Sequence, residues 1–103
     1  MPVTLEQDPA LSLIRLEGAI DIGCAVELKS LLLQALDSGS EVRVSLEAVA
    51  DLDVTAVELL WAAGRQAKAK GVNFSLTGPA PKDVSAALGE AGLQQFLVPE
   101  NAQ

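Results

Sequence analysis

The sequence predicts an α/β domain whose mixed sheet has four or five strands and carries its helices mainly on one face. Segments with the period of strands alternate along the chain with segments that have the period of helices, an order typical of parallel crossovers. In addition, two predicted strands, 42–46 and 72–77, alternate between apolar and polar residues. Strands covered on both faces are instead continuously apolar. We therefore expect helices on one sheet face and a polar, partly wet surface on the other.

The N-terminal part begins with two strands and a helix. Residues 3–6 form a short extended candidate, and residues 11–17 form a stronger strand that a glycine ends. The helix that follows has apolar residues at intervals of three and four, which form one stripe. The members of this stripe are Ala25, Leu28, Leu31, Leu32, Ala35 and Leu36. Asp21 or Gly23 is expected to cap its start, and Gly39 stands where a left-handed residue ends many helices.

The central part predicts one strand, a loop and a second helix. Residues 42–46 alternate as a strand, residues 48–53 read as a loop, and the helix spans roughly 55–70. Its core stripe is predicted to contain Val57, Leu60, Trp61, Gly64 and Ala67. Lysines in its last turn suit the helix dipole, and Gly71 ends it.

The C-terminal part predicts a strand, a third helix and a last short strand. Residues 72–77 alternate as a strand and 78–81 form a turn. Pro81 suits the first position of a helix, which Gly92 ends. Residues 96–98 complete the order as a possible final strand.

Length and charge restrict the class of protein. The 103 residues are expected to form one domain, 1–103, and half of them are apolar, which is enough for a core. Fourteen acidic residues against seven basic ones give a net charge of −7. An acidic chain is a poor ligand for a nucleic-acid backbone and for anionic lipid. We therefore expect no nucleic-acid partner.

The residue types that most catalytic and metal sites need are missing. The chain has no histidine and no tyrosine, which removes the usual metal ligands and several general acids and bases. It also lacks phosphate-binding glycine loops, paired-cysteine motifs and nucleophile-elbow motifs. We therefore expect no enzyme activity, no metal and no cofactor.

Two single residues and the hydropathy pattern complete this picture. Cys24 is the single cysteine, so it forms no disulfide within the chain, and it is expected to be a small buried residue. Trp61, the single tryptophan, is expected in the core. No secretory signal and no run of about 18 apolar residues is found. We expect a cytoplasmic protein without direct membrane insertion, monomeric or weakly dimeric.

Ligands of parallel α/β sheets bind at the carboxyl ends of strands, which directs attention to the loop before the second helix. Thr55 is expected at the helix start, where backbone N–H groups and the dipole favour a phosphate. The residues alone favour a purely structural role, because Thr55 and Glu58 have the spacing of a capping box. Asp53 and Asp21 are each interpreted as a turn or cap residue in the same way.

The order of four segments resembles the STAS family, which includes anti-sigma-factor antagonists. Residues 16–22 resemble its first loop with an acidic residue. Val42–Leu46 followed by Leu52–Val57 resembles its central strand and helix start. Phe74–Pro79 and Ala91–Phe96 resemble its later strand and its closing segment. Together these segments span nearly the whole chain.

The resemblance implies a STAS-like β-α superhelix with a phosphorylation switch at the start of the second helix. By position Thr55 is the acceptor. The neighbours that would bind the partner are Asp21, Asp53, Val54, Ala56 and Glu58. The implied partners are a GHKL-type serine kinase that is also an anti-sigma factor, and a PP2C-type phosphatase. The implied function is that of a bacterial anti-anti-sigma-type antagonist in a partner-switching signal-transduction pathway.

A second function from a different class stays open. Small STAS proteins also act as accessory subunits of ABC-type lipid transporters or belong to chemosensory clusters. Such a protein would bind its partner through the second helix without any phosphate. Val54 and Ala56 replace the serine and glycine of the family pattern beside the acceptor.

Overall fold

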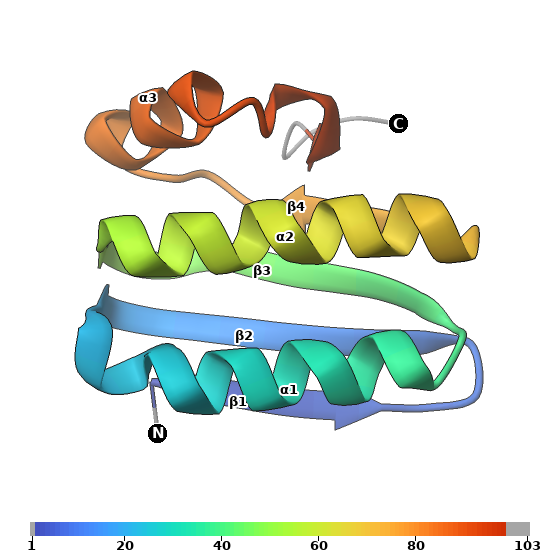
Figure 1. Ribbon diagram of the computed structural model, residues 1–103. Coiled ribbons are helices and arrows are strands. Elements are labelled where there is room, and N and C mark those ends of the chain that lie inside the picture. Colours follow the sequence, from blue (N-terminus) through green and yellow to red (C-terminus); the bar gives the residue numbers. More distant parts are fainter. Residues whose placement is uncertain (1, 99–103) are drawn as a thin grey trace.

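The computed structural model describes residues 2–98 and contains five strands, three α-helices and two short 3-10 helices (Figure 1). Along the chain the elements are β1 (Val3–Gln7), β2 (Leu11–Ile20), η1 (Ile22–Cys24), α1 (Ala25–Asp37), β3 (Glu41–Leu52), α2 (Val54–Lys70), β4 (Phe74–Thr77), α3 (Lys82–Glu90), η2 (Gln94–Phe96) and β5 (Leu97–Val98). The predicted order of elements is thereby confirmed.

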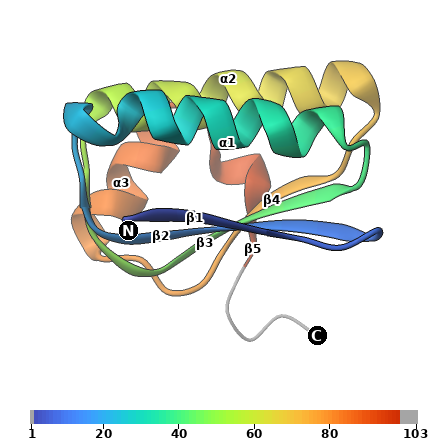
Figure 2. The same ribbon diagram turned by 90° about the horizontal axis from the view of Figure 1, so that it is seen from below.

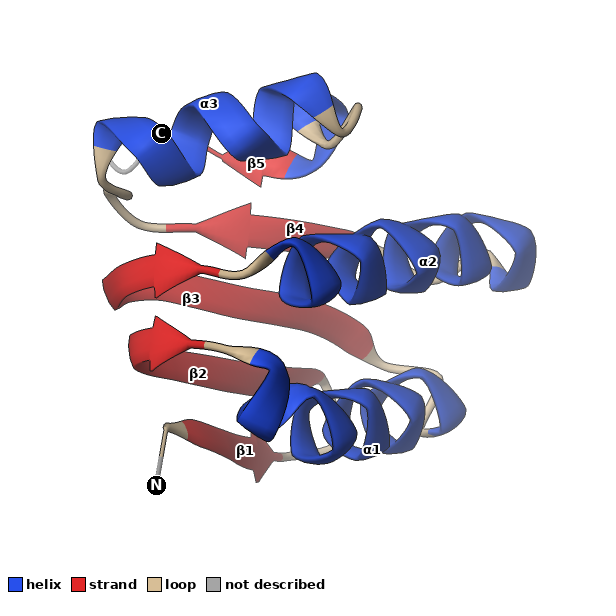
Figure 3. Ribbon diagram, turned by 60° about the vertical axis from the view of Figure 1, so that its left-hand side comes forward, coloured by secondary structure: helices blue, strands red, loops and turns tan. Residues whose placement is uncertain are grey.

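The strands form one mixed sheet in the order β1-β2-β3-β4-β5. β1 pairs antiparallel with β2, whereas every later neighbour pair is parallel (Figure 3). The parallel pairs are joined by the helices, because a chain that returns to the same end of a sheet needs a crossover. The carboxyl ends of β2, β3 and β4 therefore lie at the same end of the sheet, and α1 and α2 begin at this end (Figure 3).

α1 and α2 lie side by side on one face of the sheet, and α3 flanks the end formed by β4 and β5 (Figures 1 and 2). The core is the layer between the helices and the sheet. Its largest fully buried side chains are Ile14, Leu16, Ile20, Leu28, Leu46, Leu60, Leu76, Leu88 and Leu93. The fold prediction, with helices mainly on one face, is confirmed.

The opposite face of the sheet is largely polar. Arg15 on β2 pairs with Glu6 on β1 at 3.2 Å, and both side chains are about half exposed or more. Arg43 on β3 pairs with Glu41 at 3.0 Å on the same sheet. Ser45 also lies on this face, but unlike the charged residues it is buried.

Two strands extend beyond their predicted ends, so the predicted loop over 48–53 was wrong. β3 continues to Leu52, and β2 continues through Gly18 to Ile20. Their parallel pairing absorbs two register shifts in this stretch, and Gly18 takes a positive φ of 73° there. Buried Val49 and Leu52 anchor the extension. Sequence alternation is lost at such bulges because an extra residue changes which face the next side chain occupies.

The end of α2 explains why β4 starts later than predicted. Gly71 is left-handed with φ 74°, and the N–H of Val72 donates to the carbonyl of Ala67 at 2.9 Å. This is the hydrogen bond of a Schellman motif, so Val72 belongs to the helix end. β4 consequently begins at Phe74. At the next helix, Pro81 is the cap residue and α3 begins at Lys82.

Trp61 is not a core residue, contrary to the prediction. Its side chain is 41% exposed, and the guanidinium carbon of Arg65 lies 4.9 Å from its ring centroid. The inward face of α2 is instead completed by Ala56 and Ala63. A helix turns by about 100° per residue, which places Trp61 to one side of buried Leu60.

Candidate functional site

Two acidic residues lie at neighbouring strand ends, where β2 and β3 leave the sheet. Ile20 and Leu52 are register partners, and the N–H of Asp53 donates to the carbonyl of Ile20 at 2.8 Å. Asp21 and Asp53 directly follow this last pair. Parallel pairing thus brings together two residues that are 32 positions apart in the chain (53 minus 21).

Asp53 caps α2. Its backbone is extended (φ −67°, ψ 157°), and its carboxylate accepts a hydrogen bond from the N–H of Val54 at 2.8 Å. The helix then begins at Val54, and the N–H of Val57 donates to the carbonyl of Asp53. The capping-box reading of Thr55 with Glu58 was therefore wrong, because Thr55 is the second helical residue and Asp53 is the cap.

Asp21 caps a different element from the one predicted. Its carboxylate accepts from the N–H of Gly23 at 2.9 Å and so holds η1. α1 itself begins after Cys24, which makes no side-chain capping bond. Cys24 is half-buried and packs against the core. The short 3-10 turn therefore separates the Asp21 carboxylate from the α1 start.

Thr55 lies half-buried on the first turn of α2. Within residues 2–98 its hydroxyl makes no hydrogen bond to another protein group. The first N–H groups of a helix have no partner inside the helix, and the Asp53 carboxylate takes that of Val54. Modification of the Thr55 hydroxyl would therefore break no hydrogen bond within the described part of the protein.

The remaining predicted neighbours of Thr55 divide between surface and core. Val54 is 68% exposed, and Glu58 is exposed on the next turn. Ala56 is fully buried, so its side chain supports the helix from below and does not reach the surface. The surface around Thr55 is therefore formed by Asp21, Asp53, Val54 and Glu58.

Two further exposed apolar residues lie at the same end of the sheet, in η1 and at the start of α1, and were missed from the sequence. Ile22 is 71% exposed on η1, and Val26 is 82% exposed on the first turn of α1. η1 contacts α2, which places Ile22 beside the same helix start as Val54. The available signal was that neither residue belongs to the apolar stripe of α1. We call Asp21, Ile22, Val26, Asp53, Val54, Thr55 and Glu58 the α2-start surface.

The α2-start surface combines exposed apolar side chains, which are typical of places where another molecule binds, with carboxylates that give it a negative charge. In the part of the chain that the structure describes, no group of three histidine, cysteine or carboxylate residues could hold a metal ion. No helix of residues 2–98 is long and apolar enough to cross a membrane.

Comparison with solved structures shows the fold. The anti-sigma factor antagonist SpoIIAA in its unphosphorylated form superposes with a TM-score of 0.82 and 20% identity, over 96% of this chain and 88% of that one. The phosphorylated form of SpoIIAA from Bacillus gives 0.79 and 20%, over 96% and 91%. A serine-to-glutamate variant of RsbS from Moorella thermoacetica gives 0.77 and 21%, over 100% and 89%. No curated protein matches the chain.

The family of the chain is shown by a match to a family model. Residues 3–99, nearly the whole chain, match the family model described as "Mlab, STAS domain". The fold agrees with this match, since the structure superposes on that of an anti-sigma factor antagonist and α2 begins at Val54, directly after its cap Asp53. The chain belongs to the STAS family.

Proposed function

We propose that this protein is a phosphorylation-controlled binding protein of the anti-anti-sigma type, with Thr55 as the phosphoacceptor. The observation that carries the proposal is the position of the Thr55 hydroxyl: half-buried, on the first turn of α2, and without a hydrogen bond to another described residue. It lies within a surface of apolar and acidic side chains. SpoIIAA, which has a similar fold, is known in an unphosphorylated and a phosphorylated form, and this supports a switch of this kind.

A phosphate on Thr55 would change the electrostatics of the α2-start surface strongly. It adds a charge of about −1.5 to −2. The first-turn N–H groups and the positive end of the helix dipole attract this charge. Asp21 and Asp53 repel it. A partner that packs on Val54 and Ile22 would then have to bury a dianion beside existing carboxylates. A charge that is left unpaired in a buried interface typically weakens binding by about 2–5 kcal/mol.

The proposed partners are those that the family resemblance implies. A GHKL-type serine kinase with anti-sigma activity would bind the unmodified surface and phosphorylate Thr55, and a PP2C-type phosphatase would restore it. The pathway would operate in the bacterial cytoplasm. The protein itself would act as a binding surface and not as an enzyme.

The proposal is tested with the GHKL-type kinase encoded nearest to this gene, incubated with the protein and ATP. We expect one phosphate on Thr55 by mass spectrometry and none on Thr55→Ala. Thr77→Ala is the matched control, since Thr77 lies on β4 with its hydroxyl 3.5 Å from the carbonyl of Val44. Phosphorylation of Thr55→Ala to the same extent as the unaltered protein would refute the role of Thr55.

A second candidate function is an accessory subunit that binds through α2 without phosphorylation. The exposed Trp61 with Arg65 over its ring favours this candidate, because exposed tryptophan and arginine are typical of interface centres. Thr55→Glu would then leave affinity for a transporter ATPase unchanged, whereas Trp61→Ala would weaken it. If Thr55 is instead a phosphorylation switch, Thr55→Glu should weaken binding to the kinase, and Trp61→Ala should leave it unchanged.

A further inference from the structure

β1 is the longer of the two edge strands, and one side of it lacks a strand neighbour in the described part of the chain. It spans five residues, whereas the opposite edge strand, β5, spans two. β1 pairs with β2 without a register shift. Natural edge strands are commonly shortened or bulged, which prevents pairing with another chain. β1 has neither of these protections.

The hydrogen bonds identify which backbone groups of β1 face outward. The N–H of Glu17 donates to the carbonyl of Pro2, and the N–H of Asp8 donates to the carbonyl of Leu11. Since bonded and non-bonded pairs alternate in an antiparallel ladder, Thr4 and Glu6 also bond to β2. The N–H and C=O groups of Val3, Leu5 and Gln7 therefore point away from the sheet.

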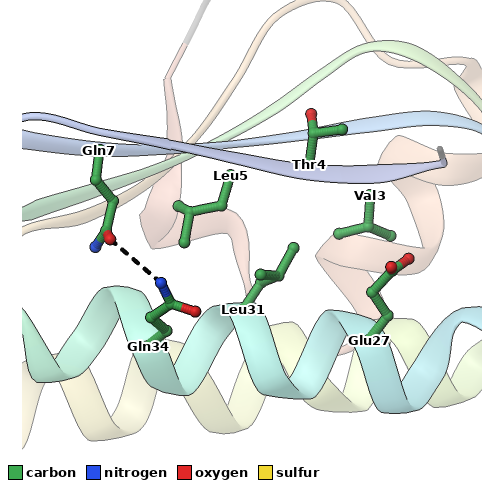
Figure 4. Close-up of a pocket in the computed structure, with 7 residues that line it drawn as sticks. All are labelled: Val3, Thr4, Leu5, Gln7, Glu27, Leu31 and Gln34. Atoms are coloured by element: carbon green, nitrogen blue, oxygen red, sulfur yellow. Dashed lines mark hydrogen bonds between the residues drawn. The ribbon is translucent and has the colours of Figure 1, made fainter.

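A groove of about 380 Å³ lies below this edge, between β1 and α1 (Figure 4). The side chains of Val3, Leu5 and Gln7 point into it, and that of Thr4 points away (Figure 4). Leu31 of α1 faces Leu5 across the groove, and both are half-buried. Gln34 donates to Gln7 at 3.4 Å and closes one end. Leu5 and Leu31 thus leave apolar surface exposed beside unpaired backbone groups.

We propose that this edge binds a second copy of the chain, with the two β1 strands paired antiparallel about a two-fold axis at Leu5. Leu5 is the middle residue of β1, so this register pairs the whole strand, with Val3 opposite Gln7 of the second copy. The outward groups of Val3, Leu5 and Gln7 would form the new ladder. On the polar sheet face Thr4 would lie opposite Glu6 of the second copy, so no like charges face each other.

The helices favour the same arrangement. α1 contacts both β1 and β2, so it lies over these two strands. Strands are about 4.8 Å apart, so the two α1 helices would be separated by about two strand spacings. That distance is within the usual 8–10 Å of packed helices. Leu31 would face Leu31 of the second copy, and Glu27 would lie near its Gln34. The apolar groove would be filled by leucines from both copies.

Amide hydrogen exchange and sedimentation velocity over a concentration series test the proposal on the unaltered protein. We expect a dimer fraction that rises with concentration, and new protection of the amides of Val3, Leu5 and Gln7 alone within β1. Because each copy carries a net charge of −7, added salt is expected to strengthen the dimer by screening. A monomer at every concentration, or a dimer in which these three amides stay unprotected, would overturn the proposal.

Two variants test the strand and the groove separately. Gln7→Pro removes an outward N–H together with the Gln7 side chain, and Leu5→Lys places a charge in the seam. Each is expected to weaken dimerisation about tenfold or more. Gln7→Ala removes the same side chain but keeps the N–H, so it should weaken the dimer less than Gln7→Pro does. Leu33→Lys introduces the same charge on an exposed leucine elsewhere and should dimerise normally. Circular dichroism establishes that each variant is folded. An unchanged dimer in both test variants would refute the seam.

Discussion

Gly64 provides a quantitative test of how α2 packs against the C-terminal segment. A glycine inside a helix is normally destabilising by about 1 kcal/mol relative to alanine. Gly64 is buried on the inward face of α2. An added Cβ there would lie 2.5 Å from Cε2 and 2.8 Å from Cζ of Phe96. Carbon atoms pack best at about 3.5–4.0 Å, so the substitution requires the Phe96 ring to move by about 1 Å.

Phe96 is not free to make that movement without cost. Its ring packs edge-to-face on Phe74, with centroids 5.3 Å apart and an interplanar angle of 83°. Such pairs contribute about 0.5–1.5 kcal/mol beyond burial, and inserted methyl groups in packed sites typically cost about 1–3 kcal/mol. When the gain of about 1 kcal/mol in helix propensity is subtracted from these two costs together, Gly64→Ala should lower the free energy of unfolding by about 0.5–3.5 kcal/mol.

The assay is urea unfolding followed by circular dichroism, combined with thermal melts. For a domain of this size we expect the Tm to fall by roughly 4–8 °C for each kcal/mol of stability that is lost. In a Phe96→Ala background the clash is absent, so Gly64→Ala should become stabilising by up to about 1 kcal/mol. Ala69→Gly, at an exposed position of the same helix, measures the propensity effect alone. A higher Tm for Gly64→Ala in the otherwise unaltered protein would refute the packing argument.

Three further local interactions are tested by substitution, each by urea unfolding. Asp53→Ala should destabilise the protein by about 1 kcal/mol through loss of the α2 cap, whereas Asp53→Asn, which can also cap, should cost much less. Gly78→Ala should destabilise the protein more than Gly39→Ala, although both glycines have a positive φ. A Cβ at position 78 would lie 2.4 Å from Cγ of Glu47, whereas a Cβ at position 39 meets nothing within 4 Å. Equal losses of stability would contradict this argument. Asp37→Asn should change stability by less than about 0.5 kcal/mol, since its ion pair with Lys70 is exposed, and a larger loss would show that this pair matters.

The sequence by itself determined the architecture and the position of the helix that carries Thr55. Alternation in 42–46 predicted one covered and one polar sheet face, and the structure confirms it. The alternation of a strand and the apolar stripe of a helix both depend on residues within a few positions of each other, so they can be recognised in the sequence. The family resemblance likewise rests on short segments in a fixed order.

Only the tertiary structure decided which groups meet and which side chains face solvent. Asp21 and Asp53 become neighbours through the β2–β3 register, and that register contains two shifts that no local pattern reveals. Trp61 is exposed because small residues complete the inward face of α2 and the Phe96 ring occupies the space above Gly64. The free edge of β1 depends on strand order, which arises from long-range pairing. These features involve residues far apart in the chain, so local periodicity carries no information about them.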